Sequence, residues 1–428
     1  MREDETISLC PVCLGRIPAR YAREANGDIY MEKACPAHGA FRVPLWRGAP
    51  GFEDWRREEA NEPPRPDVAS RLGCPYDCGL CPAHRQSPCC VLVDVTERCS
   101  GGCKVCFAAA GPAGAHQSLE ALEALGDELQ ARSEGAPYNI QLSGGEPAEH
   151  PDIERAVGLF SERFPYVQMN TNGLRLAQEP AFAQRLAEAG LSCVFLQFYG
   201  TGDGIYESLC GRPLMAEKLR AVEHCGAAGL PVVLAMNVMP GVNGEEIGPA
   251  LRFAMERMPV VRGVHFLPVS RMGRYGGPLD PAARMTLPEL LRAMERQTQY
   301  AVSRDDFVPL VSGSCACSFH GSFFVDGGAV TPLTTRDDAL LCACKQDAIR
   351  RARAYLARRW GSAPTGAGDL PLDAHGFVIT AMAFMDAWNF DVRRAEKCRL
   401  HVAKPGGLYP FCAYNVTSAQ GERLYGRG

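Results

Sequence analysis

The stretch that decides the fold is Val91-Leu-Val-Asp-Val-Thr-Glu-Arg-Cys99-Ser-Gly-Gly-Cys103-Lys-Val-Cys106, an apolar strand that runs directly into a loop with three cysteines. Three thiolates at this spacing can ligate three irons of a [4Fe–4S] cluster and leave the fourth iron without a protein ligand. An open iron can chelate a small molecule. The alternatives for the same residues are a four-cysteine electron-transfer cluster or a zinc knuckle.

The residues that follow alternate between short apolar segments and longer amphipathic ones. Six strand–helix units of this kind predict an α/β fold with a parallel sheet, curved into a partial (β/α)6 barrel over residues 91–304. Its active site is expected at the carboxyl ends of the strands. The strands are predicted at Val91–Val95, Tyr138–Leu142, Tyr166–Asn170, Cys193–Phe198, Pro231–Val238 and Gly263–Pro268, and the helices at about 117–132, 152–164, 178–189, 214–228, 244–257 and 287–304.

A second motif follows the second predicted strand, Ser143-Gly144-Gly145-Glu146-Pro147. Glycines at this place allow the backbone to approach a ligand closely, and the Glu146 carboxylate can accept hydrogen bonds from an amino group. Alone, the motif is typical of a turn that ends a strand. One strand after a Cys-x3-Cys-x2-Cys loop, it indicates a binding site.

Together, the two motifs resemble those of the radical S-adenosylmethionine (SAM) superfamily. The resemblance implies that Cys99, Cys103 and Cys106 ligate a [4Fe–4S] cluster whose open iron chelates SAM. It also implies that SAM is cleaved reductively to a 5′-deoxyadenosyl radical, which abstracts hydrogen from a substrate. The residues expected to contact SAM are Gly144, Gly145, Glu146 and Pro147, then Asn170 and Asn172 near the ribose, and Asn243 in the adenine-side turn Met239-Pro-Gly-Val-Asn243. Where the superfamily has an aromatic residue before the third cysteine, this chain has Val105, with Phe107 after it.

Three further groups of cysteines flank this region. In residues 1–50, Cys10-Pro-Val-Cys13 and Cys35-Pro-Ala-His38 have the spacing of a zinc-ribbon or rubredoxin-like module that holds one zinc or iron ion. Residues 51–90 read as a proline-rich linker followed by cysteines for an auxiliary [4Fe–4S] cluster. Its expected ligands are Cys74, Cys78, Cys81 and Cys89, with Cys90 in reserve.

Residues 305–428 contain the last group of cysteines and are predicted to form a C-terminal iron–sulfur domain. A second auxiliary cluster is expected on Cys317, Cys398 and Cys412, with Cys315 or Cys342 as its fourth ligand. Cys342 and Cys344 could instead be a free redox or substrate-binding pair. The cysteines of the central region, Cys193, Cys210 and Cys225, are interpreted as small buried residues.

The order of these motifs resembles the branch of the superfamily that contains archaeal tetraether lipid synthase and the 6-hydroxymethyl-7,8-dihydropterin methylase. That branch has a second cysteine where this chain has Ser322. The resemblance implies an enzyme that forms a C–C bond, either by coupling lipid chains or by alkylating a pterin or another small molecule. The alternatives are a maturase that modifies a peptide or installs sulfur, and a non-enzymatic electron carrier. Residues 377–390 could line an apolar channel or form an ordinary packed helix, and Tyr199 and Arg271 are candidates for substrate contact.

The composition limits the partners. The formal net charge is −4 over 428 residues, so a basic surface for nucleic acid is not expected. The chain has no run of about 18 apolar residues, so no transmembrane helix is expected. Peripheral membrane contact is possible if the substrate is a lipid. The acidic N-terminus is unlike a secretory signal, so a reducing cytoplasm, anaerobic or well protected, is expected for the 20 cysteines. The other expected partners are a small-molecule substrate and flavodoxin or ferredoxin as electron donor.

Overall fold

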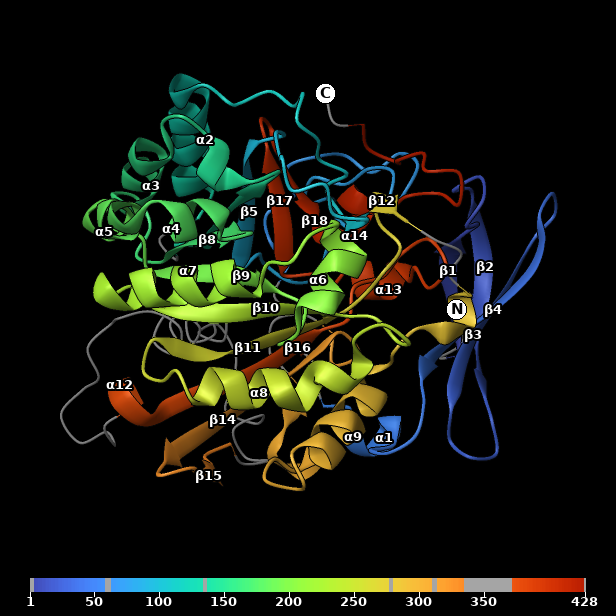
Figure 1. Ribbon diagram of the computed structural model, residues 1–428. Helices are drawn as coiled ribbons and strands as arrows, with labels where there is room; N and C mark the ends of the chain where they lie inside the picture. The colour runs from blue at the N-terminus through green and yellow to red at the C-terminus, as the bar shows by residue number, and fades with distance from the viewer. Residues whose placement is uncertain are drawn as a thin grey trace.

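The computed structural model describes residues 4–57, 63–133, 137–276, 280–309, 314–334 and 372–426. The roles predicted for Cys342 and Cys344 fall outside these residues. A four-stranded antiparallel sheet is separate from a larger mixed sheet, and Figure 1 shows it beside the C-terminal segments of the chain. Its strands follow one another in sequence order, and Gly27 takes a positive φ of 87° in the hairpin turn between the second and third. They are β1 (Glu5–Leu9), β2 (Arg16–Arg23), β3 (Ile29–Cys35) and β4 (Gly39–Trp46).

The six strands predicted from the alternating pattern form the centre of the large sheet. They are parallel and adjacent in the order β11-β10-β9-β8-β7-β5, so each strand–helix unit adds its strand beside the previous one. Their near-continuous burial explains the apolar runs, because a parallel sheet is covered on both faces. The strands are β5 (Cys90–Thr96), β7 (Asn139–Gly144), β8 (Val167–Thr171), β9 (Cys193–Phe198), β10 (Val232–Val238) and β11 (Val261–Pro268).

C-terminal residues extend this sheet at both edges. Strand β16 lies parallel to β11, and β17 lies parallel to β5. The helix considered for residues 377–390 is therefore wrong, because Phe377–Met382 belong to a buried strand that pairs on both sides. The added strands are β13 (Val308–Pro309), β14 (Ser318–Asp326), β15 (Ala329–Pro332), β16 (Gly376–Met382), β17 (Leu400–Lys404) and β18 (Gly407–Pro410), and a separate pair is formed by β6 (Val105–Cys106) and β12 (Arg274–Tyr275).

The helices between the parallel strands pack along the sheet (Figure 1). Helix α2 begins after Ser118, whose side chain accepts a hydrogen bond from the Ala121 N–H, and it buries Leu122 and Leu129 on one face. The helices are α1 (Phe52–Trp55), α2 (Leu119–Arg132), α3 (Ile153–Ser161), α4 (Leu174–Gln178), α5 (Pro180–Glu188), α6 (Asp203–Cys210), α7 (Met215–Ala227), α8 (Ile247–Met255), α9 (Leu287–Gln297), α12 (Leu372–His375), α13 (Val392–Ala395) and α14 (Phe411–Asn415).

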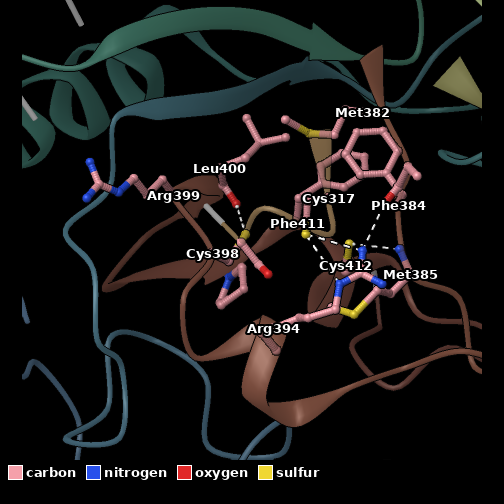
Figure 2. A pocket seen from close by; sticks show the side chains of 14 residues that line it. Cys317, Met382, Phe384, Met385, Arg394, Cys398, Arg399, Leu400, Phe411 and Cys412 are labelled. Atoms are coloured by element: carbon pink, nitrogen blue, oxygen red, sulfur yellow. Dashed lines mark hydrogen bonds between the residues drawn. The ribbon is translucent and has the colours of Figure 1, made fainter. Parts of the chain in front are cut away.

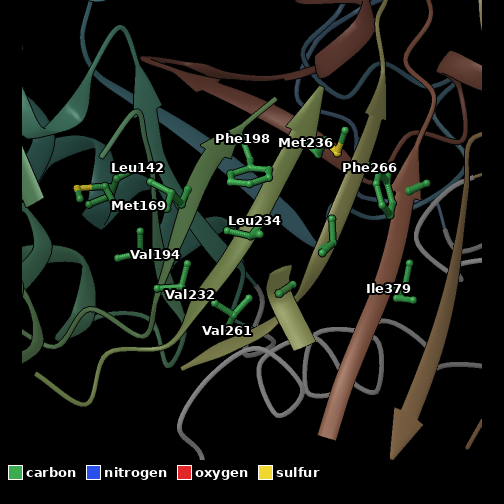
Figure 3. Packing of buried hydrophobic residues seen from close by; sticks show 14 of the residues in the cluster. Leu142, Met169, Val194, Phe198, Val232, Leu234, Met236, Val261, Phe266 and Ile379 are labelled. Atoms are coloured by element: carbon green, nitrogen blue, oxygen red, sulfur yellow. The ribbon is translucent and has the colours of Figure 1, made fainter. Parts of the chain in front are cut away.

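The main hydrophobic core lies along the parallel strands. Figure 3 shows side chains from neighbouring strands gathered in one layer, among them Leu142, Val194, Leu234, Phe266 and Ile379. All five are buried, with at most 1% of each residue exposed.

The start of the predicted linker also joins this core. Trp55 packs 5.9 Å from Trp46 and 6.4 Å from Phe319, measured between ring centroids, and its indole donates to the Cys315 carbonyl oxygen over 2.9 Å. Residues 51–57 are thus anchored to the large sheet. Among the helices that the structure describes, none combines the length and the apolar composition needed to cross a membrane.

Candidate active site

The cysteine loop and the glycine motif are joined directly by their backbones. The Gly145 N–H donates to the Thr96 oxygen over 2.6 Å, and the Glu146 N–H donates to the Arg98 oxygen over 2.8 Å. A Cβ on Gly145 would lie 2.1 Å from the Arg98 oxygen, and one on Gly144 would lie 2.1 Å from the Thr96 oxygen. Both glycines are therefore required for the loop that begins at Cys99 to rest against the next strand.

Two of the three cysteines of the loop, Cys99 and Cys103, flank one glycine beside this junction. A Cβ on Gly101 would lie 3.3 Å from Cys99 Sγ and 3.8 Å from Cys103 Sγ, so both sulfurs flank the same glycine. Cys106 lies on β6, which pairs with β12. A hydrogen bond with the Cys210 thiol, together with lesser favourable contacts, lowers the pKa of Cys103 to about 6. Burial raises the pKa of Cys99 to about 12. The three thiols have the donor set of a [4Fe–4S] cluster with one open iron.

Glu146 is buried at the end of β7 and organises the segment after β8. Its Oε1 accepts hydrogen bonds from the Ala148 N–H and the Thr171 hydroxyl, and its Oε2 accepts one from the Asn172 N–H over 2.6 Å. Burial raises the Glu146 pKa to about 7 against the effect of these hydrogen bonds. Oε2 keeps a second lone pair that can accept from an amino group. Pro147 begins a short 3-10 turn, for which the Glu146 side chain is the N-terminal cap.

Asn172 supplies an observation that fits a bound ligand. Its Oδ1 accepts from the Leu174 N–H, but its buried Nδ2 has no hydrogen-bond partner within the described part of the chain. This donor faces the cysteine loop, because a Cβ on Gly101 would lie 3.7 Å from it. An orphaned buried donor is costly unless a ligand satisfies it. Asn172 and Glu146 also line a solvent-open cleft of about 1240 Å³ together with Ser100. The residues present therefore fit SAM.

The other two predicted asparagines are already engaged. Asn170 Oδ1 accepts a hydrogen bond from Gln168 Nε2, on the same strand, over 2.9 Å. Asn170 Nδ2 donates to Gln141 Oε1, on the neighbouring strand β7, over 3.4 Å. The Asn243 amide accepts from the Met239 N–H and donates to the Tyr199 carbonyl oxygen, both over 2.7 Å, and so fixes the turn after β10. Any contribution of Asn243 to cofactor binding is made through the turn that it holds.

Val105 and Phe107 lie in different hydrophobic clusters. Val105 packs with Tyr199 and Met239, beside the turn expected at the adenine. Phe107 packs instead with C-terminal residues, and its ring centroid is 5.4 Å from that of Phe411. Of the two, Val105 is in the position to contact the adenine side.

Two candidate functional residues, Lys218 and Cys210, are indicated by the structure and not by the sequence motifs. Lys218 is buried, its Nζ donates to the Asn172 carbonyl oxygen over 2.6 Å, and Cys103 and Glu146 both contribute to its electrostatic surroundings. Cys210 was interpreted as a buried core residue, but it is partly exposed and its Sγ lies 3.8 Å from Cys103 Sγ. Lys218 had a detectable signal, because it occupies the apolar face that α7 buries with Ala221.

The N-terminal module brings its four predicted ligands together. The ligand atoms of Cys10, Cys13, Cys35 and His38 all lie within 4.8 Å of one another. His38 Nδ1 is 3.5 Å from Cys10 Sγ and 3.4 Å from Cys35 Sγ. Hydrogen bonding, first from the Ala37 N–H, lowers the Cys35 pKa to about 6. Three sulfurs and one imidazole at this spacing fit one zinc or iron ion.

The second group of cysteines is assembled only in part. A hydrogen bond with Cys78 and burial hold the Cys74 pKa well above its usual value, and the charge of Cys81 adds to this effect. Cys78 thus contacts Cys74 directly, whereas Cys81 acts on Cys74 only through its charge. Cys89, predicted as the fourth ligand, lies in a separate hydrophobic cluster with Cys90, Tyr166 and Cys193.

The C-terminal cysteines Cys317, Cys398 and Cys412 converge on one pocket, shown in Figure 2. The guanidinium of Arg394 donates to Cys317 Sγ over 3.2 and 3.4 Å, and the Met385 N–H donates to Cys412 Sγ over 3.3 Å. Donors aimed at the sulfurs are suited to thiolates that carry a charge.

Cys315 is not among the residues that line the C-terminal pocket. It is buried next to Trp55, which binds its carbonyl oxygen. Of the ligands predicted for the second auxiliary cluster, Cys317, Cys398 and Cys412 thus line one pocket, and the cluster itself stays a prediction.

Comparisons with known proteins find two family profiles in this chain. A profile of the radical SAM superfamily matches residues 93–254, and a profile of the HMPTM N-terminal zinc ribbon domain matches residues 3–47. The second match confirms the predicted zinc-ribbon-like module.

The similarity to one relative covers nearly the whole chain. The 7,8-dihydro-6-hydroxymethylpterin dimethyltransferase of Methanocaldococcus jannaschii is 32% identical over 480 residues, covering 98% of this chain and 94% of the relative. GTP 3′,8-cyclase of Alkaliphilus oremlandii is 24% identical over 188 residues, covering 43% of this chain and 58% of the relative. Among solved structures, Streptococcus suis SuiB bound to S-adenosylmethionine gives a TM-score of 0.42 at 15% identity, covering 51% of this chain and 48% of that one.

Proposed function

Because the chain belongs to the radical SAM superfamily, we propose that it is an enzyme that transfers a methyl or other alkyl group to an unactivated carbon and so forms a C–C bond. When bound, the cluster and SAM would supply a 5′-deoxyadenosyl radical that abstracts hydrogen from that carbon. The observation that carries the proposal is the near-full-length similarity to a dihydropterin dimethyltransferase. The preferred substrate class is therefore a pterin or a related small heterocycle.

Specific residues of the chain would hold the reactants. Cys99, Cys103 and Cys106 would ligate the SAM cluster. The free lone pair on Glu146 Oε2 would accept from the amino group of SAM, and the unpaired Asn172 Nδ2 would donate to an oxygen of SAM. These roles are compatible, because Glu146 itself fixes the Asn172 backbone.

Lys218 would add a positive charge to the same pocket. Its ammonium group is buried and is fixed by the Asn172 carbonyl oxygen. A fixed cation in a buried site attracts an anionic group strongly, because water does not screen it. We assign Lys218 to the carboxylate of SAM.

Aromatic residues connect the SAM loop with the C-terminal pocket. The ring centroid of Phe411 is 5.4 Å from that of Phe107 and 4.3 Å from that of Phe384. Phe384 and Phe411 line the pocket that contains Cys317 and Cys412. An auxiliary [4Fe–4S] cluster held there would be connected to the SAM loop through these packed rings. The other auxiliary cluster is proposed on Cys74, Cys78 and Cys81, with flavodoxin or ferredoxin as the external donor.

The test is turnover of anaerobic protein with SAM, reduced flavodoxin and either 6-hydroxymethyl-7,8-dihydropterin or its phosphate ester. The proposal predicts 5′-deoxyadenosine together with a pterin product that has gained one or more methyl groups, detected by mass spectrometry. Parallel incubations contain an archaeal lipid or a peptide in place of the pterin. Formation of a coupled lipid, or of a peptide that is modified or carries added sulfur, would show that the pterin assignment is wrong. Absence of 5′-deoxyadenosine with all three substrate classes would overturn the proposed activity.

A further inference from the structure

A third cavity lies where β10 and β11 end, and its walls include the turn expected at the adenine and Arg271, a candidate for substrate contact. It has an empty volume of about 730 Å³, its open mouth included, within the range of small-molecule sites. One wall is the turn that contains Met239 and Val242, and another is Tyr275. Arg271, Arg284 and Asp386 also line it.

The cavity is attached directly to the cysteine loop. In the β6–β12 pair, Tyr275 lies opposite Val105, and Arg274 lies opposite Cys106. The Gly276 N–H extends this ladder and donates to the Lys104 oxygen over 2.8 Å. A molecule in the cavity would therefore lie beside the third cysteine and the proposed adenine turn, the location that a substrate of the radical requires.

The charges at the base of the cavity are not equally available. Arg284 makes two hydrogen bonds of 3.0 Å to the buried Asp386 carboxylate, which also accepts from the N–H groups of Arg271 and Trp388, both over 2.9 Å. Asp386 and Arg284 therefore neutralise each other. The Asp280 carboxylate at the rim accepts from the Ala282 N–H.

The Arg271 guanidinium, in contrast, has no carboxylate partner among the described residues. Throughout the described ranges it makes no ion pair, and its buried Nε has no hydrogen-bond acceptor. The guanidinium carbon lies 5.6 Å from the Tyr275 ring centroid and 5.5 Å from that of Trp388, so the two aromatic rings fix its position. An arginine held in this way retains its planar set of donors for an oxyanion.

We propose that Arg271 binds an oxyanion of the substrate, a phosphate or a carboxylate, and thereby holds the substrate over the SAM loop. The inference rests on the proposed function and narrows its substrate to molecules that carry such a group. A neutral dihydropterin would bind through a phosphorylated form of its side chain. A lipid would bind through its headgroup phosphate.

The experiment uses the full chain with its clusters and measures line broadening of inorganic phosphate by ³¹P NMR. Broadening is expected with the wild type and with Arg155→Gln, an exposed arginine on α3 with an i,i+3 ion pair to Asp152. Arg271→Gln should weaken phosphate binding roughly 10-fold or more, from about 1.5–3 kcal/mol for a charge-assisted hydrogen bond, and Arg271→Lys should restore part of it. Equal broadening by wild type and Arg271→Gln would overturn the proposal.

Further measurements separate the possible sources of the oxyanion and the two proposals. Cosedimentation with phosphatidylglycerol vesicles that depends on Arg271 supports a lipid phosphate, and phosphate binding without cosedimentation supports a small phosphate ester. Displacement of phosphate by equimolar acetate supports a carboxylate. Arg271 is given no part in SAM cleavage without substrate, so the yield of 5′-deoxyadenosine should be equal in the wild type and in Arg271→Gln. If the wild type forms no 5′-deoxyadenosine, the proposed function is refuted, while phosphate binding still tests the anion site separately. Equal thermal unfolding of the variants excludes misfolding as the cause of lost binding.

Discussion

Substitution of Gly145 by alanine tests the junction between the two motifs. The new Cβ would lie 2.1 Å from the Arg98 oxygen and 2.6 Å from the Arg98 carbonyl carbon, and both are backbone atoms. The strand end and the cysteine loop must separate, which breaks the hydrogen bonds from Gly145 to Thr96 and from Glu146 to Arg98. We expect the free energy of unfolding to decrease by about 2–6 kcal/mol. About 1–3 kcal/mol of this comes from overpacking and about 0.5–1.5 kcal/mol from each of the two lost hydrogen bonds.

The assay compares urea unfolding and iron per chain for Gly145→Ala, Gly158→Ala and wild type. Gly158 is the matched control, because it lies in α3 with no atom within 4 Å of an added Cβ. Its substitution should stabilise the protein by about 0.5–1 kcal/mol, the usual gain from alanine within a helix. Gly145→Ala should also reduce the iron of the SAM cluster. Wild-type stability and wild-type iron in Gly145→Ala would refute the proposed role of this contact.

Three further predictions concern other parts of the molecule. Cys13→Ser should remove about one metal ion per chain, because it removes one of four ligands; elemental analysis checks this, and unchanged metal content would contradict it. Lys218→Met should weaken SAM binding roughly 10-fold or more, from about 1.5–3 kcal/mol for a charged hydrogen bond, as measured by anaerobic calorimetry; unchanged affinity would exclude the assigned role. Burial lowers the His265 pKa to about 4, so the unfolded chain binds more protons between pH 6.5 and 4. Stability should therefore fall by about 3 kcal/mol as pH decreases through that window. His265→Gln should flatten this dependence in urea unfolding, and an equal slope in both proteins would show that another group is responsible.

The central strands were predictable because each is a short apolar segment between amphipathic helices, and consecutive units pair with each other. Strand β16 was not predictable in this way. Its partners are β11, more than 100 residues earlier, and β14, so its pattern carries no local information about pairing. A continuous apolar run such as Phe377–Met382 fits a buried strand and a buried helix equally well.

Spacing predicted the metal-binding groups best where the ligands are close in sequence. Cys10, Cys13, Cys35 and His38 meet because two short turns at one end of a small sheet present them. Cys317, Cys398 and Cys412 line one pocket, but their neighbour Arg394 could be identified only from the fold. In the same way, the packing of Phe107 against Phe411 depends on residues more than 300 positions apart.

The central claim is that the loop of Cys99, Cys103 and Cys106 holds the SAM cluster, and not the similarly spaced loop of Cys74, Cys78 and Cys81. The most direct measurement is 5′-deoxyadenosine formed from SAM and dithionite by the two triple-alanine variants, with SAM-induced changes in the electron paramagnetic resonance signal recorded on the same samples. The account predicts that the Cys99/Cys103/Cys106 variant forms none and lacks the SAM-induced change, whereas the Cys74/Cys78/Cys81 variant retains both. Loss of both signals only in the Cys74/Cys78/Cys81 variant would contradict it.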